Sequence, residues 1–347
     1  WVEYQSSTDR RNYGVRTVDG KEVPEQSDLA TIPYIQVQQC RGDHLTYDNS
    51  TPYIYSATAY AAHSADILRR TAYILGKTDD EKRYTELFEN IKRAFNDAWV
   101  NDDGSVSYYG EVSSQTAHCG ESVALDGSVT RYTYYAENTP HCPSQTAYAL
   151  AVDFDLIPTD KLKNTREYFK NSILRNNCKL TVGFLGISHL APALSKVGLD
   201  DVAFKLLEQE DNPSWLYSVK NGATTIWERW NSYIAETGTF GDVSMNSFNH
   251  YSYGAIGQWF FTDILGICPV EFGYKSFMLS PKFGGGLTYA KGSFTSPYGK
   301  ISSAWKLHDG KFTYDCTVPT NTTATLKLPN GDIHTLVGGS YHFEINV

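Results

Sequence analysis

The feature that most limits the possible folds of this chain is a change of hydrophobic periodicity near residue 266. Before it, apolar residues recur at helical spacing, and short connections such as Leu75-Gly-Lys-Thr78 separate the helical segments. Short connections of this kind favour antiparallel helix hairpins. After it, short strand-like runs are separated by turn sequences such as Pro329-Asn-Gly331. The sequence therefore predicts a mainly α chain in which helix hairpins are followed by a small antiparallel β-sandwich.

The first helical stretch, Tyr53–Trp99, is expected to contain two helices. Gly76 is a suitable stop for the first, and Thr78 with Glu81 three residues later has the spacing of a capping box for the second. Further helices are expected over Ser144–Phe154, Thr159–Asn176, Phe184–Val197, Asp200–Glu208 and Tyr253–Leu265. Repeated helix pairs of this kind indicate a toroid or superhelix of hairpins.

The C-terminal region is expected to form a separate sandwich domain, so we divide the chain into residues 1–265 and 266–347. The expected strands are Tyr274–Leu279, Leu287–Phe294, Lys300–Lys306, Lys311–Val318, Thr323–Leu328 and Tyr341–Val347. Two polar segments, Arg11–Ser50 and Ser107–Cys142, match neither pattern. We expect them to be long loops that act as lids or rims.

Composition excludes several classes of function. A net charge of −9 with 20% charged residues argues against a nucleic-acid binder, which concentrates Lys and Arg on one face.

The six cysteines show no zinc spacing; we expect free thiols, although Cys119 and Cys142 could meet across a loop. We expect no metal, no cofactor and no membrane span. No signal peptide is visible, and the chain, which opens on Trp1, does not specify a compartment.

The strongest functional signal is Gly222–Trp230, which places Glu228 and Arg229 between the indoles of Trp227 and Trp230. About twenty residues later, Met245–Tyr251 adds His250, two amides and further rings. Indole faces stack on the apolar faces of sugars, whereas carboxylate, imidazole and amide groups hydrogen-bond the hydroxyls. A lone carboxylate in this setting indicates carbohydrate chemistry.

These motifs resemble those of the bacterial α-L-rhamnosidases of glycoside hydrolase family 78. The resemblance lies in GATTIWERW (222–230), MNSFNHY (245–251), PSWLY (213–217), SQTAYAL (144–150) and GFLG (183–186). It continues into the C-terminal region through the Gly-rich run that begins at Ser280, and it extends from about Tyr53 to about Leu328. It implies an (α/α)6 toroid followed by a C-terminal β-sandwich.

The resemblance also implies an inverting glycosidase that releases terminal α-L-rhamnose from an oligosaccharide or glycoside. Glu228 would be the general base, His250 would contact rhamnose hydroxyls, and Trp227 and Trp230 would shape the pocket. Arg229 would orient the carboxylate through a forked hydrogen bond. The alternatives are structural: a Glu228–Arg229 ion pair, and a buried histidine bonded to backbone. For three further residues we expect structural roles: loop-tying amides at Asn246 and Asn249, and packing at Trp215.

The chain departs from the family pattern in its N-terminal part. The family carries its general acid in an Asp-Cys-Pro-Gln-Arg-x-Glu-Arg segment upstream of these motifs, and this sequence contains no such segment. The family's Gly-Asp-Trp has no counterpart at Tyr13–Arg16. About seven helices are predicted where a toroid has twelve. We therefore expect the C-terminal portion of a longer protein, inactive alone, whose missing N-terminal part is its partner.

Two other classes of function remain compatible with the sequence. A catalytically silent carbohydrate-binding relative would keep the aromatic cleft without hydrolysis. A structural helical repeat with a sandwich cap would use every aromatic residue in its core. Glu228 distinguishes them: it is needed for turnover in an enzyme, and it is buried away from any cleft in a structural repeat.

Overall fold

The computed structural model describes residues 33–36, 42–47, 51–107 and 143–347. It also gives the backbone of four short strands: β1 (Val15–Val18), β2 (Lys21–Pro24), β3 (Cys119–Val123) and β4 (Val129–Thr133). The side chains of Cys119, Cys142, Val15 and Arg16, on which two predictions depend, lie outside the described part, as do most of the two predicted lid segments. The chain forms two compact units, Trp1–Val202 with Gln209–Tyr253, and Ala203–Glu208 with Gly254–Val347.

Most helices follow the predicted ranges. They are α2 (Tyr53–Ile74), α3 (Thr78–Trp99), α4 (Gln145–Asp153), α5 (Leu162–Leu174), α6 (Phe184–Lys196), α7 (Asp200–Leu207) and α8 (Trp215–Lys220). The periodicity does not predict α8, because six residues are too few to show a helical repeat. The last predicted helix is irregular: a 3₁₀ turn (Ser252–Ile256), the short α9 (Gly257–Trp259) and a π-turn (Phe260–Ile264).

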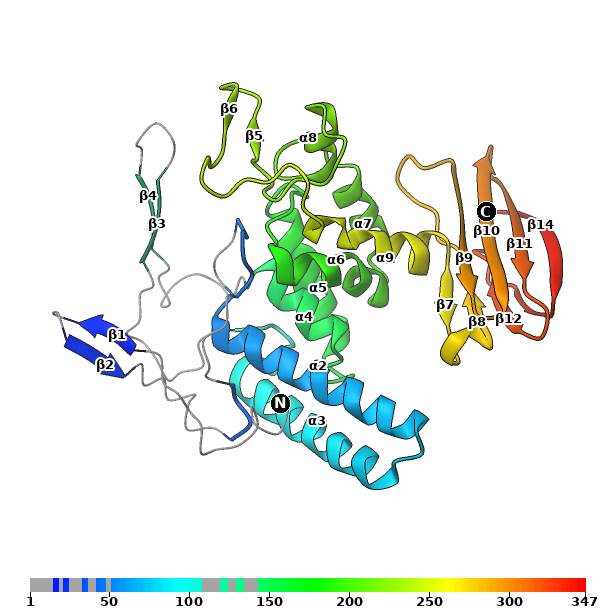
Figure 1. The fold of residues 1–347 in the computed structure, drawn as a ribbon, viewed down its shortest axis with the longest axis horizontal. Coiled ribbons are helices and arrows are strands. Elements are labelled where there is room, and N and C mark those ends of the chain that lie inside the picture. Colours follow the sequence, from blue (N-terminus) through cyan, green and yellow to red (C-terminus); the bar gives the residue numbers. More distant parts are fainter. Residues whose placement is uncertain are drawn as a thin grey trace. The chain divides into compact units, whose positions relative to one another are not determined.

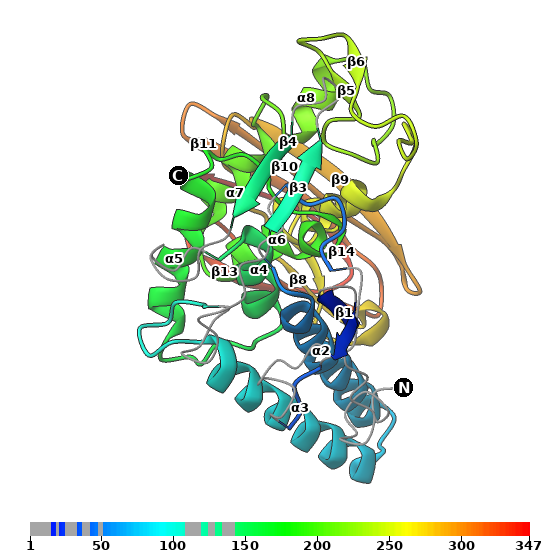
Figure 2. The ribbon, with the colours of Figure 1, turned by 90° about the vertical axis from the view of Figure 1, so that its left-hand side faces the viewer.

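Helices α2 and α3 form an antiparallel hairpin, and both views show them side by side (Figures 1 and 2). Gly76 ends α2 as predicted: it adopts a φ of +64°, in the left-handed region that follows many helices. The predicted capping box is wrong. The N-cap of α3 is Lys77, which makes no side-chain cap bond, so Thr78 is already the first helical residue. The tight turn through Gly76 starts the helix one residue earlier than the motif requires.

Burial divides the helices into two kinds. Residues 145–152 of α4 are all buried, which is typical of a helix surrounded by other elements. By contrast, α3 buries one stripe that includes Phe95 and Trp99, and its other residues face solvent or are partly exposed. The ring of Tyr55 lies 4.8 Å from Phe95 and 5.2 Å from Trp99, so α2 and α3 share an aromatic core. This arrangement matches the two helix layers of a hairpin toroid.

The C-terminal unit contains two four-stranded sheets, ordered β14-β11-β10-β9 and β13-β12-β8-β7. The strands are β7 (Ile267–Pro269), β8 (Ser276–Leu279), β9 (Tyr289–Ser296), β10 (Gly299–His308), β11 (Lys311–Val318), β12 (Thr323–Lys327), β13 (Ile333–Leu336) and β14 (Gly339–Asn346). Strands β7 and β13 are too short and too mixed in composition to be predicted. All pairs are antiparallel except β8 with β12, which is parallel.

Alternation along the strands makes the sandwich core. In β11 every second residue is buried, which places Phe312 and Tyr314 on one face. Trp305 of β10 is 1% exposed, and its ring lies 5.9 Å from that of Phe312. Its indole N–H donates to the carbonyl of Ile264 at 2.9 Å, so the polar atom of the largest core residue is satisfied.

Gly266, where the periodicity changes, must be a glycine. Its φ is +71°, and a Cβ there would lie 2.2 Å from the carbonyl carbon of Ser280. We expect Gly266→Ala to lower the free energy of unfolding by about 3 kcal/mol, because strain and a backbone clash combine. Gly331→Ala is the matched control: its φ is +95° but a Cβ meets nothing within 4 Å. Equal losses in denaturant unfolding of the two variants would show that the clash does not matter.

Candidate active site

Two segments about twenty residues apart in the sequence lie side by side through backbone hydrogen bonds. The amide of His250 donates to the carbonyl of Ile226 at 2.8 Å, and the amide of Glu228 donates to the carbonyl of Ser247 at 2.8 Å. The GATTIWERW and MNSFNHY motifs are therefore paired, and Glu228 and His250 come from neighbouring positions of one structure. That both residues act on one substrate stays a prediction.

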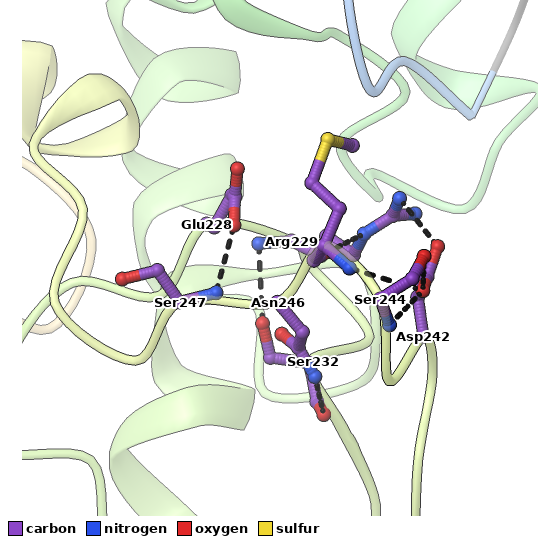
Figure 3. A network of polar contacts seen from close by, with 8 residues as sticks. Glu228, Arg229, Ser232, Asp242, Ser244, Asn246 and Ser247 are labelled. Carbon is purple, nitrogen blue, oxygen red and sulfur yellow. Dashed lines mark hydrogen bonds and ion pairs between the residues drawn. The ribbon is translucent and has the colours of Figure 1, made fainter.

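The carboxylate of Glu228 is held from one side. Its Oε2 accepts a hydrogen bond from the backbone N–H of Ser247 at 2.7 Å, and the second oxygen points away from this bond (Figure 3). The side chain is half-buried. A carboxylate that is fixed through one oxygen keeps a defined direction for the other, which is the geometry that a positioned base needs.

The predicted forked bond from Arg229 to Glu228 is wrong. The guanidinium of Arg229 pairs with Asp242, with Nη2 and Oδ2 2.9 Å apart, and its Nε donates to the carbonyl of Met245 at 2.7 Å. Figure 3 shows the two side chains leaving the chain in different directions, as neighbouring residues outside a helix commonly do. Arg229 ties the 242–245 loop in place, and Glu228 is oriented by a backbone amide.

His250 lies between two aromatic rings. Phe184 is stacked on it at 5.0 Å between ring centroids, and Tyr251 at 5.5 Å, with interplanar angles of 19° and 7°. The amide of Ser252 donates to Nδ1 at 3.3 Å, which in the neutral ring places the proton on Nε2. Nε2–H is therefore the group of His250 that is suited to donate to a hydroxyl.

The two indoles occupy supporting positions. Trp230 is 2% exposed; its Nε1–H donates to the carbonyl of Val182 at 2.9 Å, and Tyr253 is stacked on it at 3.8 Å. Trp227 is 6% exposed and meets the ring of Phe248 edge-on at 5.2 Å. Both indoles line a pocket of about 240 Å³ whose lining includes neither Glu228 nor His250. Their direct contact with substrate stays a prediction.

Two of the three expected structural roles agree with the observed contacts. The amide of Asn246 donates to the carbonyl of Ser232 at 2.8 Å, which ties the loop to the preceding turn. Trp215 packs edge-on against Trp230, and its Nε1–H donates to the carbonyl of Tyr253 at 2.9 Å. For Asn249 the contact is made by its backbone N–H, which donates to the hydroxyl of Ser247 at 3.2 Å.

Asp43 is a buried carboxylate that no sequence pattern indicates. Its Oδ1 accepts from the amides of Leu185 and Gly186 at 2.8 and 2.9 Å, and its Oδ2 accepts from the amide of Gly183 at 2.8 Å and from the hydroxyl of Thr146. These amides belong to the first turn of α6, so Asp43 caps the N-terminus of that helix although it lies 140 residues earlier in the sequence than Gly183.

Asp43 is connected to the site through its neighbours. The ring of Phe184, which stacks on His250, also meets His44 edge-on at 5.5 Å. The hydroxyl of Tyr253, whose ring stacks on Trp230, donates to the carbonyl of Leu45 at 3.1 Å. The loop that carries Asp43 thus supports both the histidine and the indole side of the site.

Comparison with known proteins shows the family of the chain. A family model described as the bacterial alpha-L-rhamnosidase 6 hairpin glycosidase domain matches residues 21–264, and one for the C-terminal domain of the same enzymes matches residues 266–343. The chain belongs to the bacterial α-L-rhamnosidase family. Its fold is part of the six-hairpin glycosidase domain followed by the C-terminal β domain.

Individual relatives carry the same name. An alpha-L-rhamnosidase of Streptomyces avermitilis is 38% identical over 288 residues, which are 83% of this chain and 24% of that protein. One of Formosa agariphila is 34% identical over 88% of this chain and 28% of that protein. The chain therefore spans about a quarter of the length of these relatives.

Solved structures show the same likeness. The Streptomyces avermitilis alpha-L-rhamnosidase complexed with L-rhamnose superposes with a TM-score of 0.77 at 33% identity, covering 90% of this chain and 29% of that one. The Aspergillus terreus enzyme gives a TM-score of 0.73 at 30% identity, covering 86% of this chain and 31% of that one. Within the described residues, no helix is long and apolar enough to span a membrane, and no cluster of three or more His, Cys, Asp or Glu side chains is suited to a metal ion.

Proposed function

We propose that this chain carries the water-activating half of an inverting α-L-rhamnosidase, with Glu228 as the general base. The observation that supports this most strongly is the pairing of the two motifs, which holds the Glu228 carboxylate by the Ser247 amide and places His250 on the same paired segments. A directed carboxylate and an imidazole carried by the same paired segments suit a site where a sugar is held and a water molecule is deprotonated.

In the proposed reaction, Glu228 removes a proton from a water molecule as its oxygen attacks the anomeric carbon of rhamnose. The bond from that carbon to the glycosidic oxygen breaks, and the leaving oxygen takes a proton from a general acid on the opposite side. His250 would donate through Nε2 to a rhamnose hydroxyl. The sugar is then released with inverted configuration, as β-L-rhamnose.

The general acid is proposed to lie outside residues 1–347. Asp242 and Asp43 are acidic residues of the described part that contact the segments carrying the site, and both are engaged. Asp242 pairs with Arg229 and also accepts bonds from Ser244, and Asp43 accepts four hydrogen bonds in the interior. Neither is placed to give a proton to a leaving group. We propose that residues 1–347 alone are inactive, since the sequence contains no Asp-Cys-Pro-Gln-Arg-x-Glu-Arg segment.

We also propose that the catalytic toroid ends at residue 265 and that the C-terminal domain begins at residue 266. The two family models, which meet between residues 264 and 266, support this division. A rhamnose-containing oligosaccharide or glycoside is the proposed substrate, since each of the relatives described above is named an alpha-L-rhamnosidase.

The test is proton NMR of the first product. A full-length protein that contains this chain should release β-L-rhamnose from 4-nitrophenyl α-L-rhamnopyranoside before mutarotation, and residues 1–347 alone should release none. Release of α-L-rhamnose would overturn the inverting mechanism. Rhamnose binding without any release by the full-length protein would identify a catalytically silent relative. Release by residues 1–347 alone would overturn the proposed position of the acid.

A further inference from the structure

The aromatic pocket next to the candidate active site has a binding chemistry of its own. It lies between α8 and the segment that follows, and its lining is Trp215, Ser218, Val219, Ala223, Thr224, Thr225, Ile226, Trp227, Arg229, Trp230 and Tyr253. Trp230 and Tyr253 are 2% and 1% exposed, whereas Val219 is 60% exposed. The pocket therefore has a buried aromatic floor and an open mouth.

The pocket and the candidate base lie on different sides of one peptide segment. Trp227 and Arg229 belong to the lining, but Glu228 between them does not. Its carboxylate is instead directed to the Ser247 amide. A molecule in the pocket would contact Trp227 and Arg229, the neighbours of Glu228 in the chain, without contacting the Glu228 carboxylate.

The lining favours a neutral ligand. Arg229 is the charged residue of the lining, and its guanidinium already pairs with Asp242 at 2.9 Å. The positive charge of Arg229 is therefore compensated and does not require an anionic ligand. Four side chains of the lining carry hydroxyls, those of Ser218, Thr224, Thr225 and Tyr253. The hydroxyls of Thr225 and Tyr253 already donate to the carbonyls of Phe248 and Leu45, so they face a ligand as acceptors. Hydroxyls both donate and accept, which suits a ligand that carries hydroxyl groups itself.

Size limits the ligand further. The volume of about 240 Å³ is below the range of roughly 300–1,000 Å³ that is common for drug-sized ligands, so the pocket takes a single ring. We propose that it binds one neutral ring with an apolar face and hydroxyl groups at its edge, either a pyranose or a phenol, at a site distinct from Glu228. This site is independent of whether Glu228 catalyses hydrolysis.

Binding to residues 1–347 can be measured by saturation-transfer NMR and by tryptophan fluorescence titration, with methyl β-D-glucopyranoside and phenol as separate probes. We expect at least one probe to bind with a dissociation constant on the order of 1 mM, which is typical of a single small ring. Binding of the glucoside alone would identify a sugar subsite, and binding of phenol alone would identify a subsite for an aromatic ring.

Two variants close the mouth of the pocket at exposed positions. Val219→Trp and Thr224→Trp should each weaken binding at least about tenfold, since an indole would occupy the space of the ring. Lys220→Trp is the matched control, because it adds an indole to the same helix outside the lining and should keep the wild-type affinity. Glu228→Gln should also keep the wild-type affinity for the probes.

The proposal is overturned if neither probe binds. It is also overturned if folded Val219→Trp and Thr224→Trp proteins, checked by circular dichroism, both bind as wild type does. Loss of binding in Glu228→Gln would place the probe at the candidate active site instead. None of these results depends on rhamnosidase activity, so failure here and failure of the proposed function are separate outcomes.

Discussion

Glu228→Gln in the full-length protein is expected to lower kcat for 4-nitrophenyl α-L-rhamnopyranoside by about 10²–10⁴-fold, the usual contribution of a general base. Glutamine has nearly the same shape, and its amide oxygen can still accept the bond from Ser247 that orients Glu228. It cannot take a proton from water. Because Glu228 takes the proton only in the transition state, KM and the affinity for rhamnose should change little.

The matched control is Glu236→Gln, the same chemical change at an exposed carboxylate on the turn between β5 (Tyr233–Ile234) and β6 (Thr239–Phe240). It should leave kcat within about twofold of wild type, as expected for a surface substitution away from the site. Steady-state kinetics give kcat, and calorimetric titration with L-rhamnose gives the affinity. Wild-type turnover in Glu228→Gln would contradict the assigned role. A large loss of rhamnose affinity with unchanged kcat would make Glu228 a binding residue.

Asp43→Ala is expected to lower the free energy of unfolding by about 4 kcal/mol, because it leaves the amides of Gly183, Leu185 and Gly186 and the hydroxyl of Thr146 without their acceptor in the interior. The rhamnose affinity should fall as well, since α6 carries the ring of Phe184 that stacks on His250. Denaturant unfolding and calorimetric titration measure the two effects. Ser214→Ala, which removes the side-chain cap of α8, should cost only about 1 kcal/mol.

Asp43→Asn tests the charge of this buried residue. Burial raises the pKa of the Asp43 carboxyl, and the four donors around it act in the opposite direction. Four donors are best matched by the ionised form, which only accepts. In Asp43→Asn the side-chain NH₂ would face a backbone N–H, so we expect a loss of about 2 kcal/mol. A stability equal to wild type would mean that Asp43 is protonated.

Most of the fold could be predicted because its signals are local. Helices such as α2 and strands such as β11 have enough residues to show a repeat, and Gly76 marks a helix end through its own backbone preference. The predictions failed where a helix is too short to show a repeat, and where a neighbouring segment sets the boundary of a helix. Helix α8 has only six residues, and the start of α3 was set by the turn before it and not by the hydroxyl of Thr78.

The roles of Glu228 and His250 stay predictions, but the sequence indicates both residues because each stands in a contiguous motif. The two motifs are paired by backbone hydrogen bonds, a contact that the motifs themselves do not predict. The partner of Arg229 was not predictable, because its charge fits any nearby carboxylate and only the path of the loop selects Asp242. Asp43 was missed for a related reason: its partners lie 103–143 residues away, and a single aspartate in a polar loop has no local pattern.

The most direct test of the central claim is chemical rescue of Glu228→Ala in the full-length protein with sodium azide. Azide is already a nucleophilic anion, so it needs no base, and the shortened side chain leaves room for it beside the sugar. The proposed role of Glu228 predicts that azide restores release of 4-nitrophenol and that NMR identifies the product as β-L-rhamnosyl azide. An α-L-rhamnosyl azide, or no rescue at any azide concentration in a folded variant, would contradict it.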